Sequence, residues 1–174
     1  MYKLDYNGDV NDLIHRRFFM KYPKTEQILN QLVADLTQAH MVVHQHHWYM
    51  LGHRFIKIHF YLDHVMEELE NQQDTVAERL IEINGSPIST YEEVLDLTTI
   101  PDQPGSWEVP MDERIQLILN AYKQLRDDYE KGIKISADEG DDSTNDMLIE
   151  FHTAIEKRIW ILAAEIGQRP GEGE

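Results

Sequence analysis

The chain has 174 residues and a formal net charge of −16, with 32 acidic residues against 16 Lys and Arg. This length suits one domain with a sizeable core, and the acidic surface favours cations and argues against sequence-independent nucleic-acid binding by the body of the fold. The absence of cysteine excludes disulfides and thiolate metal sites. No apolar run approaches the ~18 residues of a membrane span, and the N-terminus lacks the apolar core of a signal peptide. We therefore expect a cytoplasmic protein without a membrane partner.

Residues 1–24 form a locally basic extension, which Pro23 separates from the rest. Its candidate DNA-binding residues are Arg16, Arg17, Lys21 and Lys24. Two interpretations stay open: a tail packed on its own subunit, or an arm that contacts DNA phosphates, which requires only positive charge within reach. In the second case the protein would also associate with the nucleoid.

The first long helix is expected to run from Thr25, as its N-cap, to about Met50. Near its end stand His47, a candidate metal ligand, and Trp48, which alone would be interpreted as a packed aromatic. The other histidines of this region have no such partners, so the prediction for them is a hydrogen-bonded interface role, with His44 left open as an auxiliary ligand. These interface histidines are His40, His46 and His64.

The second helix is predicted over Phe55–Ile83 by apolar residues three or four positions apart. His59 with Asp63, and Asp74 with Glu78, are two i,i+4 pairs, and each pair projects from one helix face and could bind one cation. The two pairs begin fifteen residues apart, which is roughly 22 Å along an α-helix. One chain therefore cannot bring both pairs to the same ion.

The two pairs are placed symmetrically along this helix. The outer ligands, His59 and Glu78, have the same mean position as the inner two, between residues 68 and 69. Two copies of the helix, antiparallel about a two-fold axis at that point, would set each pair opposite the other and form two sites at once. His47 would join from the preceding helix, which turns at Gly52. The pattern predicts a metal site shared between subunits.

The segment HHWYMLG, then His59 and Asp63, and DTVAERLIEINGSPIST from Asp74 onward resemble the Dps family (DNA-binding protein from starved cells), the mini-ferritins, and most closely its Gram-positive peroxide-resistance type. The resemblance implies an all-α, ferritin-like four-helix bundle over residues 25–167, with a short extra helix in the long connection between helices two and three. It also implies a spherical homo-dodecamer that oxidises Fe2+, preferably with H2O2, stores ferric mineral and protects the cell from oxidative damage.

The resemblance further implies the metal and the roles of the site residues. Iron would occupy a two-iron ferroxidase centre shared between two subunits, and the tryptophan would lie beside it to supply electrons or take up radical damage. The residues concerned are His47, His59 and Asp63 of one subunit, Asp74 and Glu78 of its mate, and Trp48.

The candidate ligands belong to a longer acidic stripe on the second helix, which on its own would be interpreted as a solvated face. Many family members carry acids at two further positions, which here hold Phe60 and His64. The mineral-nucleating surface is therefore expected to be weaker or moved to Glu67 and Glu70.

Residues 86–110 are expected to form a long connection with a short helix over Tyr91–Leu97. A third long helix should open after Pro110 and close at Gly132. The last helix is expected over Asn145–Gly167, with a capping box from Ser143 to Asp146, followed by a polar tail over residues 168–174.

The acidic segment ADEGDDSTND, between the last two helices, has two interpretations. The plain one is an acidic loop that ends in a helix cap. By resemblance, Asp142 and Asp146 map to a pore at the three-fold axis, where three copies of each carboxylate would draw Fe2+ inward. A third pore acid of close relatives aligns with Ala137, and Asp138 stands next to it, so the outer ring stays open.

Two other classes of function compete with the ferroxidase. An architectural DNA-compacting protein with secondary iron chemistry would retard DNA in a salt-sensitive way that depends on residues 1–24. A structural bundle whose histidines only fill an interface would show no optical change with iron.

Overall fold

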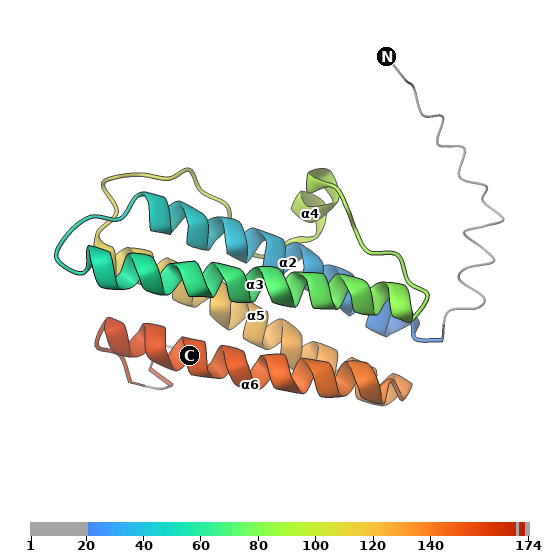
Figure 1. The fold of residues 1–174 in the computed structure, drawn as a ribbon. Helices are drawn as coiled ribbons and strands as arrows, with labels where there is room; N and C mark the ends of the chain where they lie inside the picture. Colours follow the sequence, from blue (N-terminus) through green and yellow to red (C-terminus); the bar gives the residue numbers. More distant parts are fainter. Residues whose placement is uncertain (1–20, 170, 173–174) are drawn as a thin grey trace, which may run out of the picture.

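The computed structural model describes residues 21–169 and 171–172 of the chain. The helices within this part are α2 (Pro23–Trp48), α3 (Phe55–Glu82), α4 (Tyr91–Leu97), α5 (Met111–Glu139) and α6 (Asp142–Glu165), and it contains no strand. The four long helices lie side by side as a bundle, and the short α4 lies outside it against α2 (Figure 1). The predicted four-helix bundle with an extra helix in the long connection is confirmed.

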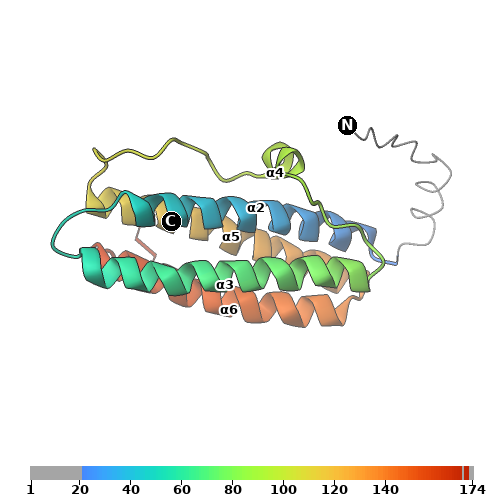
Figure 2. The same ribbon diagram turned by 45° about the horizontal axis from the view of Figure 1, so that its top comes forward.

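The chain connects the four long helices as two hairpins. α2 and α3 form the first, α5 and α6 form the second, and the crossover that carries α4 runs back along the bundle between them (Figure 2). Apolar residues of the four long helices face one another in the interior. Fully buried members include Leu29, Leu32, Leu36, Leu62, Leu69, Leu80, Ile115 and Ile118. Among the described helices, none combines the length and apolarity needed to cross a bilayer.

The start of α2 differs from the prediction. The helix begins at Pro23, and Thr25 lies inside its first turn as a buried residue rather than serving as the N-cap. The carboxylate of Glu139, at the end of α5, accepts hydrogen bonds from the backbone N–H groups of Lys24 (3.0 Å) and Thr25 (2.8 Å). An anion at this position satisfies free N–H groups and complements the helix dipole. The cap thus comes from another helix.

The end of α5 also differs from the prediction. The helix passes through Gly132 and ends at Glu139, where Gly140 has the left-handed conformation (φ 72°) that glycine adopts without strain. At Gly132, an added Cβ would lie 2.7 Å from Cδ1 of Leu148 on α6. Gly132 therefore serves close packing between α5 and α6 and does not terminate the helix.

α6 begins at Asp142, three residues before its predicted start. Its N-cap is Asp141, whose side chain accepts a hydrogen bond from the Thr144 backbone N–H (3.3 Å) and one from the Thr144 hydroxyl (2.6 Å). The predicted capping box from Ser143 to Asp146 is wrong, because both residues already lie in the first turns of the helix.

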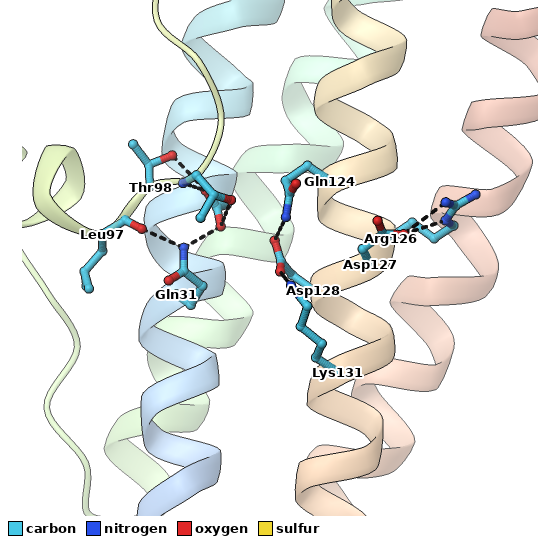
Figure 3. A network of polar contacts seen from close by, with 10 residues as sticks. Gln31, Leu97, Thr98, Gln124, Arg126, Asp127, Asp128 and Lys131 are labelled. Atoms are coloured by element: carbon cyan, nitrogen blue, oxygen red, sulfur yellow. Dashed lines mark hydrogen bonds and ion pairs between the residues drawn. The ribbon is translucent and has the colours of Figure 1, made fainter. Parts of the chain in front are cut away.

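A buried carboxylate on α2 anchors the crossover after α4. Asp35 is fully buried and accepts hydrogen bonds from the Thr98 hydroxyl and the Thr99 backbone N–H, both at 2.7 Å. Across the interface with α5, Asp128 is also buried and accepts hydrogen bonds from Gln124 and Lys131 (Figure 3). Burial raises the pKa of Asp128, and the charge of Asp35 raises it further.

Ion pairs between long side chains bridge the seam between α3 and α6. They occur at both ends of the seam and near its middle: Arg79–Asp141 (2.7 Å), Arg158–Glu68 (2.6 Å) and Lys57–Glu165 (2.6 Å). The other helix interfaces of the bundle are built mainly from the buried apolar stripes.

Candidate metal centre

Three of the predicted ligands meet where α2 gives way to α3. His47 comes from the last turn of α2, and His59 and Asp63 come from successive turns at the start of α3. The two imidazole rings are stacked, with centroids 3.7 Å apart, and His47 Nε2 lies 2.8 Å from Asp63 Oδ1. The ring of Phe55 stacks on His59 at 4.8 Å. His47 thus lies beside His59 and Asp63 within one chain, as the sequence predicts.

The donor atoms of this cluster are available for a metal. Nδ1 of His47 and Nδ1 of His59 are buried without a hydrogen-bond partner among the described residues, and Nε2 of His47 has the carboxylate of Asp63 as its close neighbour. Burial lowers the pKa of His47, the neighbouring His59 lowers it further, and Asp63 opposes the shift. The imidazole of His47 is therefore neutral at pH 7, which is the form that binds metals.

The other two predicted ligands lie on the same helix, toward its far end. Asp74 and Glu78 are both exposed, and neither forms a hydrogen bond or ion pair with another described residue. Within the described residues of one chain, no three His, Asp or Glu side chains have the arrangement of a metal site. A single chain therefore holds the donors as two separate parts.

The remaining histidines of α2 fall on two faces. His40, His44 and Trp48 form a row of neighbouring rings, T-shaped for the first pair (centroids 4.6 Å apart) and tilted for the second (5.1 Å), and Trp48 is 56% exposed. His46 lies on the opposite side, buried near Arg114, and its Nδ1 has no hydrogen-bond partner in the described part of the chain. Burial lowers the pKa of His46 to about 4. The expectation of a hydrogen-bonded interface histidine is wrong for His46.

The predicted pore acids gather at the turn between α5 and α6. Asp138, Asp142 and Asp146 are all exposed, the last two one turn apart on α6. Their neighbour Asp141 is buried and pairs with Arg79 of α3, whose guanidinium also donates to the Thr144 hydroxyl. Sequence reasoning missed Arg79, because its acidic partner is 62 positions away and no local pattern links the two.

The candidate nucleation residues Glu67 and Glu70 are exposed on α3. Glu67 and His64 line a groove between α3 and α6, and Glu70 shares a shallow hollow with Asp74. Of the candidate DNA-binding residues, Lys21 and Lys24 are exposed beside the start of α2, whereas Arg16 and Arg17 lie outside the described residues.

Comparison with known proteins identifies the family of the chain. Residues 26–170 match the family model of the ferritin-like domain. The DNA protection during starvation protein of Listeria innocua is 41% identical over 148 residues, which cover 85% of this chain and 95% of that protein. The chain belongs to the Dps family of mini-ferritins.

Other Dps proteins show the same likeness. The DNA protection during starvation protein of Streptococcus suis is 38% identical over 84% of this chain and 85% of its own length. The X-ray structure of Dps from Listeria monocytogenes superposes with a TM-score of 0.83 at 40% identity, covering 85% of this chain and 96% of that one. As a Dps protein, the chain is an iron-storage mini-ferritin.

Proposed function

We propose that this mini-ferritin is a ferroxidase whose two-iron centre forms between two subunits. One observation carries the proposal: the free donors of a single chain are split between the two ends of α3. His47, His59 and Asp63 form one half-site, and Asp74 and Glu78 form the other, unpaired and exposed. A two-fold axis near the middle of α3 would join each half-site to its complement on the partner.

The donor set suits the oxidation of iron. Imidazole nitrogen and carboxylate oxygen suit Fe2+ at one position, while a second iron would take mostly shared carboxylates and water. One H2O2 accepts one electron from each of two Fe2+ ions, its O–O bond breaks, and with two protons it yields two molecules of water. No hydroxyl radical leaves the site. Trp48, the residue after His47, would supply an electron when only one iron is present.

The acidic surfaces would handle the iron before and after oxidation. In a dodecameric shell, Asp142 and Asp146, with Asp138 outside them, would ring the pores and concentrate Fe2+ there. Ferric product would hydrolyse inside the shell, and the exposed carboxylates of Glu67 and Glu70 are the candidate nucleation sites. The net charge of −16 per chain supports attraction of cations.

The test is anaerobic loading of the purified protein with Fe2+, followed by H2O2, with near-ultraviolet absorbance and consumption of the oxidant as readouts. We expect fast oxidation at about two iron per peroxide, with mineral that co-elutes with an assembly of dodecamer size. Asp74→Asn should slow oxidation, whereas Asp96→Asn, an exposed aspartate on α4, should not. Oxidation at the protein-free rate would contradict the proposal.

DNA binding is the second candidate function. The exposed Lys21 and Lys24 favour it, and the Listeria relative carries DNA protection in its name. We expect salt-sensitive retardation of duplex DNA that is lost when residues 1–20 are deleted and Lys21 and Lys24 are both replaced by Gln, changes that keep the full length of α2. Retardation that persists unchanged in the truncated protein would exclude the extension as the DNA-binding element.

A further inference from the structure

Arg114 is a buried cation without an anionic partner. It lies in the first turn of α5 and is 2% exposed. One guanidinium nitrogen, Nη2, donates to the Ser106 carbonyl (2.6 Å), while Nη1 is buried and has no partner. Within the described residues no carboxylate pairs with Arg114; Glu113, its neighbour, is exposed and acts on it only through space. Buried arginines are rarely left unpaired, because the guanidinium stays charged.

A cavity of about 320 Å³ lies beside this guanidinium. It is lined by α2, by α5 and by residues 99–109 of the crossover, which runs along α2 in Figure 2. The volume is that of about ten water molecules and falls at the lower end of the range for small-molecule sites. His46 also lines the cavity, with its buried Nδ1 unpartnered.

The walls of the cavity indicate the kind of ligand. Val42, Ile100, Val109 and Leu117 present apolar surface, and Arg114 is the only cation among the lining residues. A single positive charge is balanced by a monoanion, and the apolar walls favour a ligand with a hydrocarbon body over a hydrated inorganic ion. The nearby Asp112 already pairs with Arg54, so it is not available to Arg114.

We propose that this cavity binds a small organic monocarboxylate. Its carboxylate would pair with Nη1 of Arg114, and its apolar body would contact Val42 and Leu117. Such charge-assisted hydrogen bonds to guanidinium are among the stronger polar contacts in proteins, and here the arginine that would form them is buried. The proposal does not depend on the iron chemistry, because the cavity lies on the side of α2 that faces α5 and not on the side of the half-site.

Benzoate and benzamide are suitable probes, because they share a shape and differ in charge. Isothermal titration calorimetry of the assembled protein should show saturable benzoate binding at one site per chain and binding of benzamide weaker by about tenfold or more. Equal binding of the two would show that the cavity recognises only apolar surface and would overturn the proposal. So would binding of sulfate in preference to benzoate, or no saturable binding of benzoate.

Two variants test the location of the site. Arg114→Met removes the charge together with the bond to Ser106, and Leu117→Trp fills the cavity while it keeps the guanidinium. Both should weaken benzoate binding by about tenfold or more, whereas Lys134→Met, which removes an exposed cation on α5, should not change it. If Arg114→Met fails to fold, Leu117→Trp decides the question. A folded Leu117→Trp protein that binds benzoate as tightly as wild type would refute the assignment.

Discussion

A site shared between subunits predicts complementation between two inactive variants. His59→Ala damages one half-site and Asp74→Ala damages the other, so each variant alone should oxidise Fe2+ near the protein-free rate. In a mixed pair, one site combines both intact halves and the other combines both defects. Random pairing after equal co-expression makes half of the pairs mixed, so about one quarter of all sites are intact and about one quarter of the wild-type rate is expected.

The geometry of α3 makes this test decisive. The two substituted positions are separated by roughly 22 Å along one continuous helix, so recovered activity cannot arise within one chain. The assay is stopped-flow oxidation of Fe2+ by H2O2, on assemblies purified through a different tag on each variant. Co-expression of wild type with Asp96→Asn should give the full rate. A mixed assembly without recovery, or a wild-type rate for Asp74→Ala alone, would refute the shared site.

Three further predictions concern the charged residues around the bundle. The double variant Asp142→Asn, Asp146→Asn should take up iron more slowly than wild type at low ionic strength. The difference should shrink in high salt, because salt screens the attraction between the wild-type carboxylates and Fe2+. Arg79→Ala leaves a buried aspartate unpaired and should lower the free energy of unfolding by about 2 to 4 kcal/mol in urea titrations, whereas Lys134→Ala, at an exposed ion pair, should change it by less than about 1 kcal/mol. The raised pKa of Asp128 means that its ionised form weakens the fold, so this contribution to stability is present below the unfolded pKa and is lost as the pH rises through the folded pKa. Asp128→Asn should therefore gain stability relative to wild type as the pH rises above the unfolded pKa of about 4, and parallel stability profiles would contradict this.

Local patterns were sufficient to predict most of the helices. The predicted α4, Tyr91–Leu97, has the observed bounds, because the hydroxyl of Thr90 and the carboxylate of Glu93 form a capping box that lies within a few residues. The start of α3 at Phe55 likewise follows from apolar spacing. The meeting of His47 with His59 was also predictable, because a short turn between two helices brings the end of one beside the start of the next.

Features that depend on distant contacts could not be predicted in this way. The sequence predicts a helix end at Gly132, because glycine often follows the last residue of a helix. In the structure, the missing side chain of Gly132 leaves room for Leu148 of the next helix. The cap of α2 is Glu139, more than a hundred positions away. No sequence pattern predicts a role for Arg114, because its burial and its unpartnered Nη1 become visible only in the folded chain. The second half of the metal centre needs another chain and stays a prediction.

The ion pairs along the α3–α6 seam make this interface respond to salt and acid differently from the other helix interfaces. Simple salts do not weaken apolar packing across the other interfaces, whereas ionic contacts weaken in high salt and lose their carboxylate charge in acid. Acid or applied force should therefore part the molecule first between α3 and α6. The two hairpins would then swing apart as rigid halves, hinged at the interface of α2 with α5.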